Sequence, residues 1–226
     1  MSPTAVIESA WRLYSSHWTH FVTLAAIVFV AVAIISALLS TLGTFGALLG
    51  AIISAVGTFL VWGALVTAVD DARDGRVDLT IEDTFRASRG RLLQVALAGV
   101  ILGLVVGIGF VLLVVPGLFA MTWLFAVIPV VVLERLDFGQ AFSRSIELVK
   151  GHAWQVFLLI LLVFLILLVV SVVVGLVLGA FGLPLWLNVL LRSIIANTLI
   201  VPFLACALTL GYFALKEGES SPPTAA

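Results

Sequence analysis

The chain offers few side chains whose types and spacing could support chemistry, and the clearest are its three histidines. His17, His20 and His152 lie at the predicted boundaries of apolar segments, and together with Glu8 they could converge on a metal ion such as zinc. Polar residues at membrane boundaries are far more common than metal sites. The sequence therefore predicts neither a metal site nor a cofactor.

Motifs for catalysis are missing from the sequence. It contains no G-x-S-x-G nucleophile turn, no Walker loop, no H-E-x-x-H helix and no C-x-x-C pair. The single cysteine, Cys206, lies in an apolar segment and excludes an intrachain disulfide. We therefore expect a protein that is not an enzyme and has no catalytic residues.

Arg192 is the one charged residue between Lys150 and Lys216. An arginine at the centre of a bilayer costs roughly 2.5–3.5 kcal/mol on insertion scales and is usually retained for function. Arg192 could form a polar site with Asn188 and Asn197, or it could anchor the chain at the membrane surface. No carboxylate or lysine interrupts the apolar segments, which disfavours an ion-coupled pump.

The elements that must position these residues are long and free of charge. The chain is 63% hydrophobic and 10% charged, with a formal net charge of -1, unlike a soluble domain at roughly 25% charged. Uncharged segments cover 13–69, 92–133, 151–191 and 193–215. The second of these would be ~63 Å long as one helix, twice the thickness of a bilayer core. It must fold back, and Pro116-Gly117 is the expected turn, with Val115 leaving helical geometry.

The sequence thus predicts an all-α, polytopic membrane protein with six transmembrane helices arranged as three hairpins. One integral membrane domain should cover 1–217, with a disordered tail at 218–226. Residues 43–46 should form the first tight turn, Pro129 should kink the fourth helix, and 185–192 is expected to lie on the membrane surface. The expected helices lie near 19–42, 47–69, 92–114, 116–133, 154–181 and 194–215.

Basic residues predict the orientation of the chain. If the amino terminus is cytoplasmic, ten of the eleven Lys and Arg residues fall on that side, with Arg192 as the exception. The positive-inside rule then places both termini in the cytoplasm.

Each hairpin is preceded by a short amphipathic segment, which suggests a threefold repeat. Ser9, Trp18 and Phe21 share their spacing with Ser145, Trp154 and Phe157, while the copy before the third helix is weaker. We expect each segment to form an interfacial helix with its tryptophan at headgroup level. Asp137 with Gln140, and Thr80 with Asp83, have the spacing of capping boxes.

Glycines at a spacing of four residues form a stripe on the third predicted helix. Gly99, Gly103 and Gly107 would allow close approach of a neighbouring helix. Packing within the monomer is the simplest expectation, and Gly103→Leu should then loosen the fold. A dimer interface or a lipid groove along the stripe is the alternative.

The segment 115–157 carries the most specific motif in the chain. Glu134 lies at the end of the fourth helix, where we expect it to pair with Arg144 and fix the next connection. Pro202 and Gly211-Tyr212-Phe213 extend the pattern near the carboxyl end. The residues that define the motif are Pro116, Gly117, Trp123, Pro129, Glu134, Arg144, Ser145, Gly151 and Trp154.

This motif resembles bacterial membrane proteins related to the membrane domain of glycerophosphoryl diester phosphodiesterase and neighbouring six-helix families of unknown function. The resemblance covers nearly the whole chain and implies a multi-pass protein of the bacterial inner membrane with cytoplasmic termini. It implies no phosphodiesterase activity, because the hydrolase of that family is a separate soluble domain.

These observations favour a non-enzymatic membrane scaffold or accessory subunit. The alternative is a transporter or lipid-handling protein with a groove between the helical hairpins. Membrane lipids and a membrane or cytoplasmic protein are the expected partners, and the charge of the chain gives no reason to expect nucleic acid.

Overall fold

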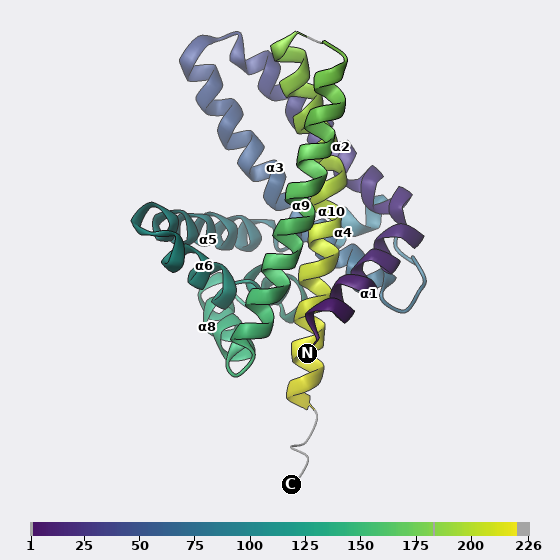
Figure 1. The fold of residues 1–226 in the computed structure, drawn as a ribbon, viewed down its shortest axis with the longest axis vertical. Coiled ribbons are helices and arrows are strands. Elements are labelled where there is room, and N and C mark those ends of the chain that lie inside the picture. Colours follow the sequence, from purple (N-terminus) through teal and green to yellow (C-terminus); the bar gives the residue numbers. More distant parts are fainter. Residues whose placement is uncertain (1, 183, 221–226) are drawn as a thin grey trace.

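Six helical segments long and apolar enough to cross a membrane make up most of the computed structural model, which describes residues 2–182 and 184–220 (Figure 1). The protein is therefore an all-helical, multi-pass membrane protein, as the charge-free segments predict. The spanning segments are Trp18–Ser40, Gly43–Ala72, Leu92–Leu112, Val115–Glu134, Ala153–Ala180 and Asn197–Glu219.

Long helices that follow one another in the chain lie against each other (Figure 1). Helix α2 (Trp18–Ser40) lies along α3 (Gly43–Ala72), and α5 (Leu92–Leu112) lies along α6 (Val114–Trp123). Helix α9 (Ala153–Ala180) packs on α10 (Leu185–Ser220), which also packs on α1 (Pro3–Ser16), α2 and α3.

Three shorter helices overlap the predicted amphipathic segments: α1 (Pro3–Ser16), α4 (Ile81–Arg89) and α8 (Phe138–Val149). Trp18 and Phe21, expected in the first of these segments, lie on α2 instead. The hydroxyl of Thr80 caps α4 by accepting the Asp83 N–H at 3.2 Å, as its spacing predicts. Asp137 also takes the position before its helix, but its side chain makes no capping hydrogen bond. The capping-box prediction is thus right for α4 and wrong for α8.

The turns between paired helices are tighter than the sequence suggested. Gly43, with φ of 73°, is already the first residue of α3, so the predicted turn at 43–46 belongs to the helix. Between α5 and α6 the extended residue is Leu113, not Val115. Pro116 lies in the first turn of α6, where backbone N–H groups need no helical partner, so the chain can enter the helix before it.

The fourth span is broken rather than merely kinked. Helix α6 ends at Trp123, α7 covers only Val127–Pro129, and a π-helix follows at Val130–Glu134. Pro129 lacks an N–H, and its ring displaces the carbonyl of Phe125, four residues earlier. This explains why the helix is broken on the amino-terminal side of Pro129. Ser145 of α8 spans the break: its hydroxyl donates to the Trp123 carbonyl at 2.9 Å and accepts the Ala126 N–H at 3.3 Å.

Helix α10 is continuous from Leu185 to Ser220 and contains Pro202. The chain at 185–192, expected as a separate surface segment before a helix at 194, is the first part of this helix. Leu183 and residues 221–226 lie outside the described residues, and residues 218–220, the start of the predicted disordered tail, belong to α10.

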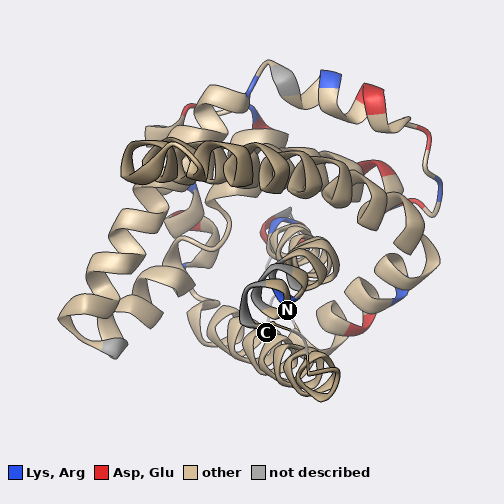
Figure 2. Cartoon of the chain, turned by 90° about the horizontal axis from the view of Figure 1, so that it is seen from above, with Lys and Arg blue, Asp and Glu red and all other residues tan. Residues whose placement is uncertain are grey.

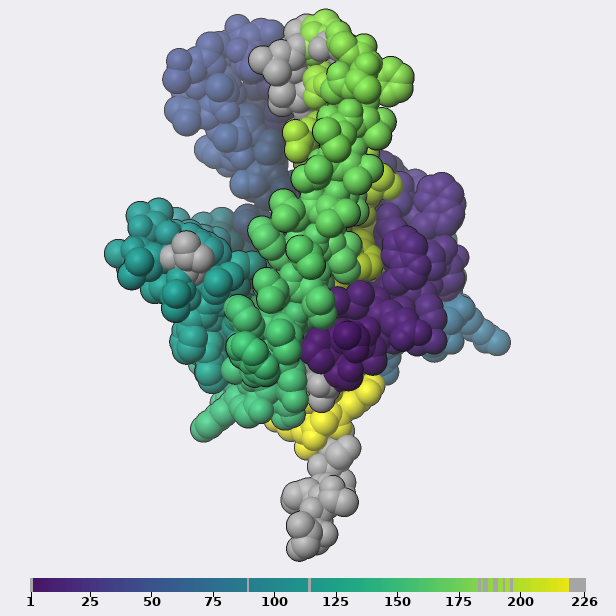
Figure 3. All heavy atoms as spheres, in the orientation of Figure 1, coloured from purple at the N-terminus to yellow at the C-terminus, as the bar shows by residue number. Residues whose placement is uncertain are grey.

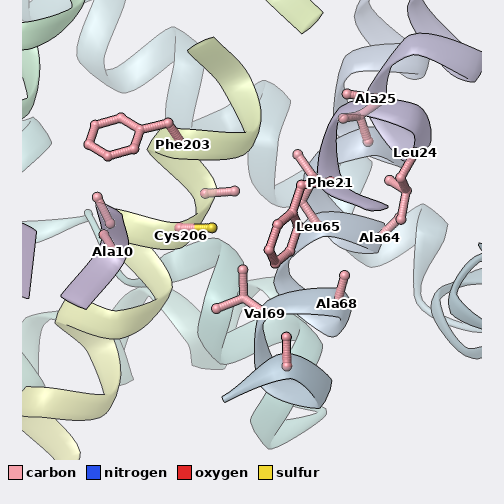
Figure 4. Packing of buried hydrophobic residues seen from close by; sticks show 14 of the residues in the cluster. Ala10, Phe21, Leu24, Ala25, Ala64, Leu65, Ala68, Val69, Phe203 and Cys206 are labelled. Carbon is pink, nitrogen blue, oxygen red and sulfur yellow. The ribbon is translucent and has the colours of Figure 1, made fainter. Parts of the chain in front are cut away.

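Buried side chains form two apolar clusters on either side of α3. The first joins α1, α2, α3, α9 and α10, and its small residues Ala10, Ala64 and Cys206 let these helices approach closely (Figure 4). The second joins α3, α5, α8, α9, α10 and the broken fourth span around Val127, Val131 and Tyr212. Helices α3, α9 and α10 contribute to both clusters and so connect them.

Large apolar side chains cover much of the exterior. The pair α5–α6 projects from the side of the molecule, and Val111 and Val115 at its tip are 87% and 74% exposed (Figure 3). Charged residues are gathered at helix ends and on the shorter helices, leaving long uncharged stretches (Figure 2). An exterior of this kind is stable only against lipid.

Candidate functional site

A network of five charged or polar side chains closes one end of the helical assembly. We call it the Glu134 network. The Glu134 carboxylate accepts a hydrogen bond from the Tyr212 hydroxyl at 2.7 Å, and its two oxygens lie 3.2 Å from Lys216 Nζ and 3.3 Å from Arg144 Nε. Arg144 also makes a bidentate pair with Glu219, at 2.6 and 3.0 Å. The predicted ion pair between Glu134 and Arg144 is confirmed.

The Glu134 network joins three segments that are distant in the sequence. Glu134 ends the fourth span, Arg144 lies on α8, and Tyr212, Lys216 and Glu219 lie on α10. Arg144 is partly buried, and its hydrogen bonds to Glu219, together with the Glu134 carboxylate, raise its pKa against the opposing effect of burial. The guanidinium therefore stays charged and holds two helices that are distant in sequence.

The network contains no arrangement suited to catalysis. Its two carboxylates and two cations balance, and no hydroxyl or thiol lies next to a histidine base within it. In the part of the chain that the structure describes, no three His, Cys, Asp or Glu side chains are placed to hold a metal ion. The geometry of the Glu134 network is suited to holding the fourth span, α8 and α10 together.

The second candidate is a cavity of about 350 Å³, which we call the apolar groove. All three helix pairs contribute to its walls, and no charged side chain lines it. The lining comes from α3 (Phe59, Trp62), α5 (Gly99, Leu102, Gly103, Val106), α6, α7 and their connection (Met121, Leu124, Phe125, Ile128, Pro129), α9 (Ile160, Val163, Phe164, Leu167) and α10 (Leu204, Leu208).

The three glycines of the α5 stripe have different surroundings. A Cβ atom on Gly99 would collide with the Phe59 ring, so this glycine allows close packing of α5 on α3. Gly103 and Gly107 have no such neighbour within 4 Å, and Gly103 lines the apolar groove. Gly103→Leu was expected to loosen the fold, but the structure shows no neighbouring atom with which the new side chain would collide at its Cβ.

The remaining motif residues surround the turns and the break. Pro116 and Gly117 lie at the start of α6, where a Cβ on Gly117 would meet the Phe110 ring at 2.6 Å. Gly151 has φ of 87° and joins α8 to α9. Trp154 is 69% exposed and stacks on Phe157. Together with Trp123, Pro129 and Ser145, these residues lie at the turns, at the break and at the start of α9, where they shape the chain.

Arg192 lies against α9 and apart from the two asparagines. Its guanidinium donates to the Ser171 carbonyl at 3.4 Å and lies 3.1 Å from the Cβ position of Gly175. Neither Asn188 nor Asn197 makes a side-chain hydrogen bond with Arg192 among the described residues. The structure therefore does not assemble the predicted polar site of Asn188, Arg192 and Asn197.

Sequence reasoning missed the partners of Glu134 on α10 and the aromatic wall of the groove on α3. Tyr212 and Lys216 are four residues apart on a helix face, a usable signal for a polar pair. Their common partner, Glu134, is 78 residues distant from Tyr212, and no local pattern predicts that contact. Phe59 and Trp62 look like ordinary apolar residues in the sequence.

Comparison of the chain with models of known protein families, with characterised proteins and with solved structures finds no match.

Proposed function

We propose that the protein handles lipids, holding a hydrocarbon chain in the apolar groove between its helix pairs. One observation carries this proposal: a cavity of about 350 Å³ at the junction of all three pairs, lined almost wholly by hydrocarbon. Typical ligand pockets have ~300–1,000 Å³ and a few polar groups that orient the ligand. The apolar groove is large enough to hold a ligand, but it has no polar side chains to orient one.

The chemistry of the groove restricts its occupant. Apolar cavities of this kind do not retain water, because water needs polar partners. Phe59, Gly103 and Phe164, which line the groove, lie in the middle parts of α3, α5 and α9. A lipid hydrocarbon chain is the apolar ligand available at this depth of a bilayer.

The topology that accompanies this proposal is three hairpins, each preceded by an interfacial helix, in the bacterial inner membrane. It is supported by the paired packing of the long helices and by the amphipathic α1, α4 and α8. With six crossings both termini lie on one side, and the distribution of Lys and Arg favours the cytoplasm.

The scaffold or accessory subunit that the sequence favoured would offer the charged residues of its shorter helices to a partner protein. On α8, Arg144 is already paired with Glu134 and Glu219. This pairing supports lipid handling, the alternative from the sequence, over the scaffold.

A substitution that fills the groove tests the proposal. Gly103→Leu should leave the thermal stability nearly unchanged, because no atom lies within 4 Å of the new Cβ, yet it should lower the amount of lipid retained by the protein. The measurement is native mass spectrometry of protein released from nanodiscs made of bacterial phospholipids.

Gly107→Leu supplies a matched control one helical turn away. Gly107 has equally open surroundings but does not line the groove, so this variant should keep the lipid occupancy of the unmodified protein. Equal occupancy in both variants would refute the proposal. A stoichiometric protein partner in the same spectra would favour the scaffold.

A further inference from the structure

A second hollow, of about 290 Å³, lies where three membrane spans end, and we call it the polar pocket. Helix α3 and the span Val115–Glu134 finish here, and α5 begins here. The pocket therefore lies where the apolar core of a bilayer gives way to headgroups. It is lined by Thr67, Asp70, Ala87, Ser88, Gly90, Arg91, Val132, Leu133 and Arg135.

Three charged side chains line the pocket: Asp70, Arg91 and Arg135. Among the described residues, none of them forms an ion pair or a side-chain hydrogen bond. Arg86 and Arg144, in contrast, are each held by carboxylates. Two guanidiniums and one carboxylate in a shared hollow are therefore free to bind a ligand that carries both signs of charge.

The hydroxyl groups in the pocket are already engaged as donors. Thr67 Oγ1 and Ser88 Oγ lie 3.1 Å apart, and they donate to the carbonyls of Gly63 and Thr84 at 3.0 and 2.9 Å. Because these hydroxyls can now only accept hydrogen bonds, an anion in the pocket must be bound by the charged groups.

Arg135 has a backbone conformation that an arginine rarely adopts. Its φ of 57° and ψ of 31° place it in the left-handed region, and no other described residue except glycine has positive φ. Glycine or asparagine would fit this position with less strain. Strained residues of this kind are concentrated at functional sites.

The start of α5 adds to the positive potential. Arg91 precedes this 21-residue helix and makes no side-chain capping bond, and the first turn contains no acidic residue. The first N–H groups of a helix have no partner within it, and together with the helix dipole they favour an anion here, in support of the two guanidiniums.

We propose that the polar pocket binds the headgroup of an aminophospholipid, with the phosphate held by Arg91 and Arg135 and the ammonium group by Asp70. This inference rests on the proposed function in taking a membrane lipid as the source of the headgroup. It concerns a separate site: the buried Val66, Val95 and Val131 lie, along their helices, between the residues of the pocket and those of the groove.

The test uses the full-length protein in nanodiscs of equal parts phosphatidylethanolamine and phosphatidylglycerol, followed by mass spectrometry of the retained lipid. The unmodified protein should retain phosphatidylethanolamine preferentially. The double variant Arg91→Gln, Arg135→Asn should retain about tenfold less of it, the effect of losing a charged hydrogen bond. Asparagine is chosen because it tolerates the left-handed conformation.

Two further variants define the role of each charge. Asp70→Asn should keep the phosphate contact but lose the preference for phosphatidylethanolamine over phosphatidylglycerol. Arg76→Gln removes an exposed arginine of the α3–α4 loop that does not line the pocket, and it should behave like the unmodified protein. An unchanged lipid preference in both the arginine double variant and Asp70→Asn would overturn the proposal.

The experiment also distinguishes lipid binding in the polar pocket from lipid binding in the apolar groove, and a bound lipid from a soluble ligand. If the headgroup proposal alone fails, Gly103→Leu still lowers lipid occupancy while the pocket variants leave lipid preference unchanged. Phosphoethanolamine added in solution should fail to displace the retained lipid; full displacement would identify the free headgroup as the ligand and overturn the lipid assignment.

Arg135→Gly distinguishes a ligand-binding role of Arg135 from a purely structural one. Glycine relieves the left-handed strain, so this variant should melt at a higher temperature and at the same time lose lipid preference. A loss of stability together with unchanged preference would contradict a ligand-binding role for Arg135.

Discussion

Replacing Glu134 with glutamine should lower the melting temperature of the protein in detergent by roughly 5–10 °C. The variant removes the charge that Arg144, Lys216 and the Tyr212 hydroxyl share, and the Glu134 side chain is only 15% exposed. Breaking one side of a mostly buried ion pair costs about 2–4 kcal/mol, which corresponds to a shift of this size in a chain of this length. The measurement is thermal unfolding followed by circular dichroism.

Glu147→Gln is the matched control for this prediction. Glu147 lies on α8 at 3.7 Å from the same Arg144, but its side chain is 66% exposed. An exposed ion pair contributes about 0–1 kcal/mol, so this variant should melt within a few degrees of the unmodified protein. Similar losses in the two variants would show that burial of the Glu134 network has no special role.

A double-mutant cycle with Tyr212→Phe tests whether the network acts as a unit. The Tyr212 hydroxyl donates to Glu134 and accepts from Lys216, so its removal alone should cost about 1 kcal/mol. Coupled groups predict that adding Tyr212→Phe to Glu134→Gln costs almost nothing more. Strictly additive losses would contradict the coupling.

The sequence predicts the membrane class and most of the helices because charge is scarce and its positions are informative. One charged residue inside a bilayer is costly, so the uncharged segments between Arg12 and Asp70 and between Arg91 and Glu134 had to become spans. The Glu134–Arg144 pair was also predictable, since a carboxylate at the end of an apolar span needs a nearby cation.

The remaining features depend on contacts between segments distant in the sequence. The break at Leu124–Ala126 is stabilised by Ser145, and although this serine belongs to the repeat and to the motif, neither pattern predicts that its hydroxyl contacts Trp123 and Ala126. A groove along the glycine stripe that includes Gly103 was an alternative from the sequence, but its opposite wall was not predictable, because Phe59 and Trp62 resemble their lipid-facing apolar neighbours. Where every face of a helix is apolar, periodicity cannot identify the side that faces a cavity.

Replacing Gly109 with leucine should be the most disruptive apolar substitution in the α5–α6 pair. A Cβ atom at this position would lie 2.9 Å from the Gly117 Cα, 3.0 Å from its nitrogen and 3.2 Å from the Pro116 carbonyl carbon. These are backbone atoms, which cannot rotate away as a side chain can. The variant should therefore lose about 3 kcal/mol or more and melt at least 5 °C lower, because α5 and α6 must separate.

Gly107→Leu, two residues earlier on α5, separates this collision from the general effect of a larger residue. Nothing lies within 4 Å of its Cβ, and leucine favours the helix over glycine by about 1 kcal/mol, so stability should be unchanged or slightly higher. Cysteine cross-linking between the α5 and α6 tips would reveal the separation directly, with Gly109→Leu reducing the yield and Gly107→Leu preserving it. Equal melting temperatures for the two variants would show that the backbone contact at Pro116-Gly117 does not hold the pair together.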